Sequence, residues 1–156
     1  MNFLLSAGIP FFSFSVFGSA ALKVFLALIV GGIIGMERGR QGRAAGMRTH
    51  ILVCLGSALT AMIGLYASDV LGLGSDPLRI SAQVVSGIGF LGVGTILIKG
   101  RFQITGLTTA AGLWASACMG LCIGAGFIEG AVVACVLIIM TITVTTMPTR
   151  YSPLGV

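Results

Sequence analysis

The sequence predicts an all-α membrane protein, a bundle of about five transmembrane helices. Its mean hydropathy is +1.10, and only 8% of its 156 residues are charged, against about 25% in an ordinary soluble domain. Long apolar runs alternate with short polar connections. Because a backbone inside lipid must satisfy its own hydrogen bonds, these runs are expected to be helices.

Five apolar runs are long enough to cross a bilayer. The expected spans are about residues 20–36, 51–67, 80–98, 105–125 and 130–147, within one transmembrane domain at 19–150, followed by a tail at 151–156. The first 18 residues are apolar and aromatic, and Pro10 divides them into two pieces that are too short to span. We expect an interfacial segment here, and a sixth helix is the alternative.

The loop charges predict an outside N-terminus and an inside C-terminus. Seven of the nine basic residues fall in the loop after the first span, the loop after the third span and the tail. Three of the four acidic residues lie in or beside the other two loops. Since cytoplasmic loops carry an excess of Lys and Arg, the basic loops are placed inside the cell.

The span at 80–98 is expected to be the centre of the bundle. Gly87 and Gly94 lie on one flank of this helix and Gly89 lies on the other, and a glycine lets a neighbouring backbone approach closely. Other positions expected to pack between helices are Gly31 and Gly35 of the first span, and Gly112 and Trp114 of the fourth.

Two polar clusters are candidate functional sites, one at each membrane face. For each cluster, one interpretation is that its residues only set the membrane topology or anchor a helix at the interface. The functional interpretation is that they make specific contacts. In the inner cluster, Glu37 is expected to pair with Arg43 or Arg48, while the rest contacts lipid headgroups or a partner protein. In the outer cluster, Arg79 would hold Asp76 or a neighbouring helix. The inner-face cluster is Glu37, Arg38, Arg43, Arg48 and Thr49; the outer-face cluster is Asp76, Arg79 and Gln83.

Catalysis, metal binding and nucleic-acid binding are not expected. The chain has one histidine and four carboxylates, and none is paired at a spacing that suggests acid–base chemistry. The four cysteines fall inside predicted spans and are interpreted as small core residues. The basic residues follow the loops, so they indicate membrane topology and not a nucleic-acid partner. No catalytic residue, metal ligand or cofactor site is therefore predicted, and the protein is not expected to be an enzyme.

Three blocks of the sequence resemble the MgtC/SapB family of bacterial membrane proteins. They read IGMERGRQGRAAGMRTHILVCLGSAL, SDPLRISAQVVSGIGFLGVGTIL and GLTTAAGLWASACMGLCIGAG, in that order. The resemblance implies a multi-pass protein of the bacterial inner membrane that is needed for growth or virulence when magnesium is scarce. It also implies a regulatory role through contact with a membrane partner such as the F-type ATP synthase. The family usually continues into a soluble cytoplasmic domain, so either a short SapB-like member or a truncated chain is expected.

The sequence also allows two other functions. A transporter or channel for magnesium or another small ion is the main alternative, although the carboxylates lie at the membrane edges and not near the bilayer midplane. A purely structural membrane subunit is the other. Small-residue stripes on several helices also suggest a homo-oligomer, with membrane lipids around it.

Overall fold

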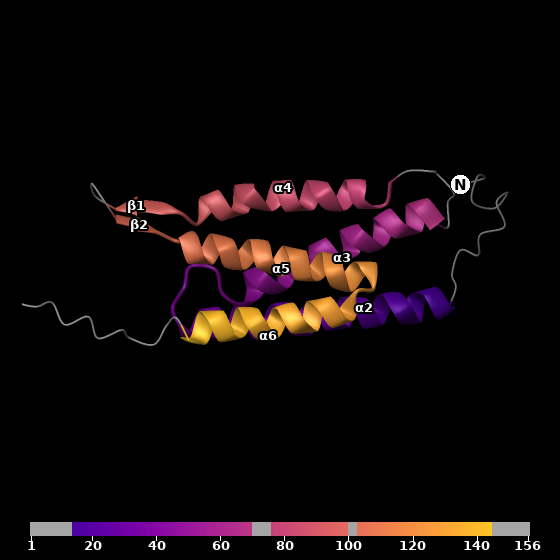
Figure 1. The fold of residues 1–156 in the computed structure, drawn as a ribbon, viewed down its shortest axis with the longest axis horizontal. Coiled ribbons are helices and arrows are strands. Elements are labelled where there is room, and N and C mark those ends of the chain that lie inside the picture. The colour runs from indigo at the N-terminus through magenta and orange to yellow at the C-terminus, as the bar shows by residue number, and fades with distance from the viewer. Residues whose placement is uncertain (1–13, 70–75, 100–102, 145–156) are drawn as a thin grey trace, which may run out of the picture.

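The computed structural model describes residues 14–69, 76–99 and 103–144, which form five helices and one β-hairpin (Figure 1). The helices lie side by side along the long axis of the molecule, and the chain runs back and forth between the two ends. The all-α membrane bundle predicted from the sequence is confirmed; its orientation across the membrane stays a prediction. The helices are α2 (Phe14–Arg40), α3 (Met47–Asp69), α4 (Leu78–Gly94), α5 (Leu107–Ala125) and α6 (Ile128–Val144), and the strands are β1 (Leu97–Lys99) and β2 (Gln103–Thr105).

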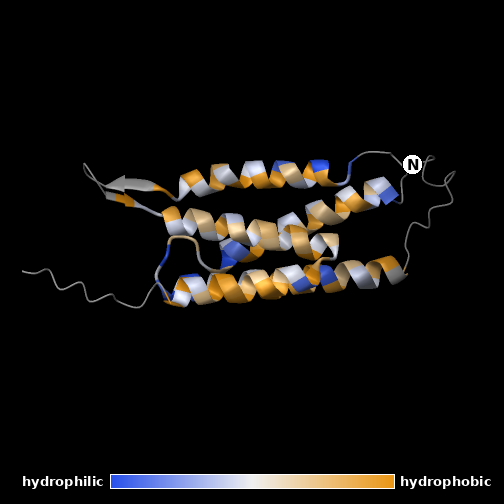
Figure 2. Ribbon diagram, viewed as in Figure 1, coloured by the Kyte–Doolittle hydropathy of each residue, from blue (hydrophilic) through white to orange (hydrophobic). Residues whose placement is uncertain are grey.

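Three of these helices, α2, α3 and α5, are long and apolar enough to cross a membrane, whereas α4 and α6 have 17 residues each. At about 1.5 Å per residue, 17 residues extend roughly 26 Å, slightly less than the ~30 Å hydrocarbon core. Hydrophilic residues gather mainly towards the helix ends, while the lengths of the helices are apolar (Figure 2). Most of the interfacial segment expected at residues 1–18, and the tail at 151–156, lie outside the described residues, but Phe14 to Gly18 belong to α2.

The helix α2 is longer at its C-terminal end than predicted, which changes the setting of the inner polar cluster. Residues 37–40 continue the helix, because Glu and Arg are good helix formers and nothing interrupts the pattern. The helix stops at Gly42, whose φ is +64°. The Gly42 N–H donates to the Gly39 carbonyl at 3.0 Å, and the Arg43 N–H donates to the Arg38 carbonyl at 3.1 Å. This is the bonding pattern of a Schellman C-cap.

The helix α4 is shorter than predicted, because a hairpin replaces its last turn. Thr95 ends the helix, with its N–H and its hydroxyl both donating to the Gly92 carbonyl. The antiparallel strands β1 and β2 pair Ile98 with Ile104. Gly106, at φ +96°, closes the hairpin against Thr95, where no side chain would fit. The hairpin lies at the same end of the bundle as the α2–α3 connection (Figure 1).

The centre of the bundle is α5, and the prediction that the helix at 80–98 is central is wrong. α5 contacts every other helix, with its most extensive contact to α3, whereas α4 packs mainly against α5 and α3. No atom lies within 4 Å of a Cβ built on Gly87, Gly89 or Gly94, so these glycines face away from the bundle. α4 instead meets α5 through Gly92, where a Cβ would lie 3.4 Å from Cβ of Ala110, and Ile88 of α4 is also buried.

A stripe of small residues explains the central position of α5. Gly112, Ser116, Gly120 and Gly124 recur every four residues and are all buried. A Cβ on Gly120 would meet the Cys54 carbonyl oxygen of α3, and one on Gly124 would meet the Ala58 carbonyl oxygen. Bare backbone on one helix thus allows the other to approach closely, which drives association in lipid.

The α2–α3 contact follows the same rule and agrees with the packing role expected for the glycines of the first span. A Cβ on Gly31 would lie 2.9 Å from the His50 carbonyl oxygen, and Gly35 packs against Met47. Trp114, in contrast, was expected between helices and is 50% exposed on α5. A large ring does not fit a seam built on glycine and alanine.

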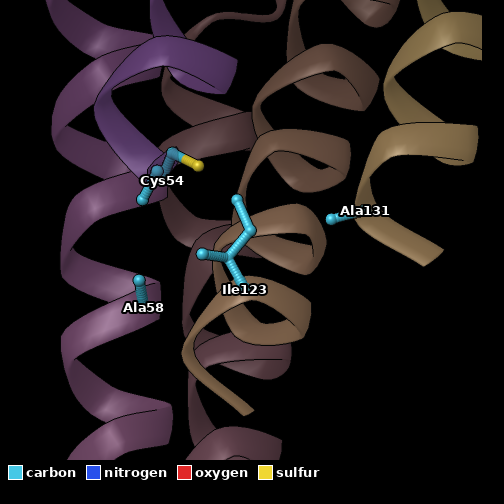
Figure 3. Packing of buried hydrophobic residues seen from close by; sticks show 5 residues of the cluster. Cys54, Ala58, Ile123 and Ala131 are labelled. Atoms are coloured by element: carbon cyan, nitrogen blue, oxygen red, sulfur yellow. The ribbon is translucent and has the colours of Figure 1, made fainter. Parts of the chain in front are cut away.

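The apolar core lies between α2, α3, α5 and α6. Cys54 and Ala58 of α3 face Ile123 of α5, and Ala131 of α6 closes the cluster (Figure 3). A second cluster joins Ile34, Met119, Cys135 and Ile142. All four cysteines carry free thiols, and Cys54 and Cys135 are buried, as expected for small core residues.

Lys23 caps the C-terminal end of α5, which the sequence did not suggest. Its Nζ donates to the Gly124 carbonyl at 3.0 Å. A lysine at a helix C-terminus binds carbonyls that have no partner in the helix and complements the helix dipole.

We expect Lys23→Met to lower the unfolding free energy by about 1 kcal/mol, because the last turn of α5 loses this charged donor. Thermal unfolding in detergent measures the effect. Lys23→Arg keeps a donor and serves as the control. Equal melting temperatures for the wild type and Lys23→Met would contradict the capping role.

Candidate functional site

Polar side chains from three helices meet inside the end of the bundle that carries the hairpin. Arg38 of α2 is 1% exposed, His50 of α3 is 0% exposed and Thr109 of α5 is 3% exposed. The extension of α2 beyond residue 36 carries Arg38 into this position. The close approach at Gly35 brings the start of α3, with His50, against α2. We call Arg38, His50 and Thr109, with the adjoining Gly112, the buried polar site.

The guanidinium of Arg38 is weakly bonded for a buried charge. Nη1 donates to Oε1 of Gln41, and Nη2 donates to Oγ1 of Thr109, both at 3.4 Å. The usual N–H···O distance is about 2.9 Å, so both bonds are long. Nε has no hydrogen-bond partner, and among the described residues the guanidinium forms no ion pair with a carboxylate. A buried charge without a counter-charge is costly, which makes it a strong candidate for a functional group.

His50 also has an unpaired nitrogen. Nδ1 lies 3.0 Å from the Gly46 carbonyl oxygen and must donate to it, since a carbonyl only accepts. Nε2 has no hydrogen-bond partner in the described part of the chain. A Cβ built on Gly112 would lie 3.4 Å from this Nε2 and 3.9 Å from Nε of Arg38. The two unpaired nitrogens therefore both lie beside Gly112.

The remaining residues of the predicted inner cluster lie outside this site. Glu37 accepts a hydrogen bond from Nε2 of Gln41 at 2.9 Å. Over residues 14–69, 76–99 and 103–144 it forms no ion pair with Arg43 or Arg48, so the pairing expected from the sequence is not present. Arg43, Arg48 and Thr49 are exposed. Glu37 thus reaches Arg38 through Gln41, and the exposed residues form a separate surface.

Two members of the site, His50 and Thr109, were missed as functional residues, and so was Gln41, which bonds Arg38. His50 was considered only as a lone histidine, and Thr109 was not considered at all. Gln41 was taken as part of a loop. The usable signal was Gly42, because a glycine after a polar helical stretch predicts where α2 stops.

The outer cluster is not assembled into a buried site. Asp76, just before α4, and Arg79 and Gln83, on its first turns, are all exposed. Oδ1 of Asp76 accepts from the Leu78 N–H at 2.9 Å, so this carboxylate binds the start of the helix. The described residues show no ion pair between Asp76 and Arg79.

We therefore expect Arg79→Lys to leave the free energy of unfolding in detergent within about 0.5 kcal/mol of the wild type, as for other exposed substitutions. Lysine keeps the charge and reaches the same membrane interface. Arg79→Ala tests the charge itself. A large destabilisation by the lysine variant would indicate the fixed bidentate contact that the sequence suggested.

A sequence model described as the MgtC family matches residues 24–150, which include every residue of the buried polar site. The chain belongs to the MgtC family. Among curated proteins, this family member is 45% identical over 127 residues to "Putative magnesium transporter YhiD" of Escherichia coli K12, an alignment that covers 79% of the chain and 59% of that relative. It is 48% identical over 113 residues to "Protein MgtC" of Brucella abortus, covering 72% of the chain and 45% of the relative.

A more distant relative comes from a Gram-positive bacterium. "Protein SapB" of Bacillus subtilis is 35% identical over 125 residues, covering 78% of the chain and 54% of that protein. The chain therefore spans about half the length of the curated relatives it matches. No solved structure matches the chain.

Proposed function

We propose that this chain is the transmembrane part of a bacterial inner-membrane protein that supports adaptation to low magnesium. In this proposal it is a regulator that acts by helix–helix contact with a membrane partner, of which the F-type ATP synthase is the candidate implied by the family. Membership of the MgtC family supports the magnesium connection, as does the printed name of the relative YhiD.

The observation that favours a regulator over a cation pathway is the buried charge of Arg38. A guanidinium inside the bundle repels a cation, by about 4 kcal/mol for a unit charge at 4 Å with an effective dielectric constant of 20. Magnesium prefers oxygen ligands from carboxylates, with waters retained. In the described part of the chain, no group of three or more His, Cys, Asp or Glu side chains could hold a metal ion.

The outward face of α4 supplies a surface for such a contact. Gly87 and Gly89 have open space beside them, and Phe90 is 84% exposed. Small residues beside a protruding ring allow a second helix to approach closely in lipid. A second copy of the chain could use the same face, which would account for the homo-oligomer predicted from the sequence.

We expect Gly87→Leu to keep the fold but lose function, because leucine blocks a close approach from outside without touching the bundle. The measurement is growth in magnesium-depleted medium of a deletion strain that carries the variant at matched membrane abundance. Gly56→Leu is the matched control, since Gly56 is an exposed helical glycine on α3 with nothing within 4 Å. Full rescue by Gly87→Leu would reject contact through α4.

The name of YhiD favours one alternative, a magnesium transporter. Reconstitution in liposomes that contain a magnesium-sensitive dye separates the two functions. A regulator gives no flux above empty vesicles, whereas saturable flux would replace our proposal with transport.

A further inference from the structure

A groove of about 560 Å³ lies between α2 and α3, at the end of the bundle opposite the hairpin. Both helices extend beyond the C-terminal end of α5 here, so α5 does not fill the space between them (Figure 1). The volume is in the range of pockets that bind small molecules, about 300–1,000 Å³. Most of the lining is apolar, with Val16, Ala20, Leu59 and Ile63 among it, and two charged residues, Lys23 and Asp69, also line the groove.

The two charged residues lie at different depths in the groove. Nζ of Lys23 donates to the Gly124 carbonyl. A Cβ on Gly124 would lie 2.8 Å from Cβ of Ala61, so the lysine binds at the level of Ala61 on α3. Asp69 comes about two turns after Ala61, roughly 12 Å further along the helix axis. The groove therefore has a cation near its floor and an anion at its open end, and in the described part of the chain the two form no ion pair.

Both charged side chains are directed towards the space between them. A Cα–Cβ bond tilts towards the N-terminus of its helix. Because α2 begins at this end of the bundle and α3 ends here, Lys23 leans towards the open end and Asp69 leans back into the groove. The Lys23 ammonium has three hydrogens, of which one bonds the Gly124 carbonyl, and the exposed carboxylate of Asp69 only accepts. A ligand in the groove can therefore accept from Lys23 and donate to Asp69.

We propose that this groove binds a phospholipid with the zwitterionic headgroup of phosphatidylethanolamine. In this lipid the phosphate lies between a primary ammonium and the acyl chains, and the charges of the groove follow the complementary order. The phosphate accepts from Lys23 and the ammonium donates to Asp69, both as charge-assisted hydrogen bonds. The acyl chains leave the groove over Leu59 and Ile63, which line it and are 47% and 59% exposed.

One cation together with one anion selects against other phospholipid headgroups. Phosphatidylglycerol carries the phosphate but no cation, so it leaves Asp69 without a partner and adds a second negative charge beside it. Phosphatidylcholine keeps the positive charge, but its quaternary ammonium has no hydrogen to donate to the carboxylate. The groove therefore prefers the ethanolamine headgroup. The proposal does not depend on the regulatory role proposed above.

Ala20→Phe tests the groove itself. Ala20 lines the groove and is half-buried, so a phenyl ring at this position takes up space that the lipid needs. Ala21→Phe is the matched control, because Ala21 is the next residue of α2, is exposed and lies outside the lining. The melting temperature of delipidated protein in detergent is measured against added phosphatidylethanolamine, and against phosphatidylglycerol at the same mole fractions.

We expect a saturable rise in melting temperature with phosphatidylethanolamine for the wild type and Ala21→Phe, and a much smaller rise for Ala20→Phe. Phosphatidylglycerol should raise the melting temperature of the wild type less at every mole fraction. Identical responses of the wild type and Ala20→Phe to phosphatidylethanolamine would overturn the proposal. So would equal responses of the wild type to the two lipids.

Asp69→Asn tests the recognition of the ammonium group. Asparagine keeps the shape of the side chain but not its charge, so the preference for phosphatidylethanolamine over phosphatidylglycerol should fall by roughly tenfold as a charge-assisted bond becomes a neutral one. Asp76→Asn is the control, because Asp76 is exposed at the same end of the bundle and lies outside the groove lining. An unchanged preference in Asp69→Asn would overturn the proposal.

Native mass spectrometry of the wild type keeps the test decisive if Ala20→Phe does not fold. The protein is extracted in mild detergent from a bacterial membrane that contains both lipids. About one phosphatidylethanolamine per chain should remain bound after other lipids have been removed. Retention of phosphatidylglycerol in its place, or of no lipid at all, would reject the proposal.

Discussion

Gly120→Leu is expected to prevent the bundle from forming a stable structure. A Cβ at this position would already meet the Cys54 carbonyl oxygen and would lie 2.8 Å from Cβ of Ser57. Backbone atoms cannot move aside as a flexible side chain can, so α3 and α5 must separate. Overpacking lowers the free energy of unfolding by about 1–3 kcal/mol at ordinary sites. We expect a larger loss for Gly120→Leu, because α3 and α5 form the most extensive helix contact of the bundle.

Thermal unfolding in detergent and the yield of folded protein after membrane extraction measure this effect. Gly56→Leu is the control on the partner helix, because it adds the same side chain where nothing lies within 4 Å. If Gly120→Leu melted at the same temperature as Gly56→Leu, α5 would not be the centre of the bundle.

Arg38→Met is expected to separate stability from function. Methionine fills most of the arginine volume without a charge, and replacing buried charges by apolar groups is often neutral or stabilising by about 1–4 kcal/mol. We therefore expect a melting temperature equal to or above that of the wild type. Growth in magnesium-depleted medium should be lost, because the guanidinium is the distinctive group of the buried polar site.

Two controls sharpen this result. Arg48→Met removes an exposed charge from the first turn of α3 and should leave both measurements unchanged. Arg38→Lys keeps the charge but not the planar fork, and should fail to restore growth. Strong destabilisation by Arg38→Met would show that the arginine is structural, and normal growth would remove it from the functional site.

The helices could be predicted from the sequence, but their arrangement could not. Long apolar runs identify membrane helices because lipid demands internal hydrogen bonding. Hydropathy does not predict which face of each helix packs against another helix, because lipid and protein neighbours are equally apolar. The glycines of α4 and those of α5 therefore gave the same signal, although Gly87 faces outward and Gly120 is buried against α3. The strict four-residue spacing on α5 was the better indication.

The buried polar site could be predicted only in part, for a related reason. Arg38 was identified by its charge beside an apolar run, but its burial depends on the point where α2 ends. His50 and Thr109 come from two other helices, and Thr109 is 71 residues away from Arg38 along the chain. No local pattern relates residues at that separation, because only the packing of α5 against α2 and α3 brings them together.

The central position of α5 also has a consequence for the order of events during synthesis. The α2–α3 contact forms between neighbours in sequence, but Thr109 and Gly112, which cover Arg38, belong to α5, the fourth of the described helices in chain order. Until α5 enters the membrane, the guanidinium of Arg38 is uncovered. The faces of α2 and α3 that later contact α5 have no helix packed against them. Before α5 inserts, α2 and α3 are therefore incompletely packed. A chaperone or the insertion machinery has to shield their exposed inner faces at this stage.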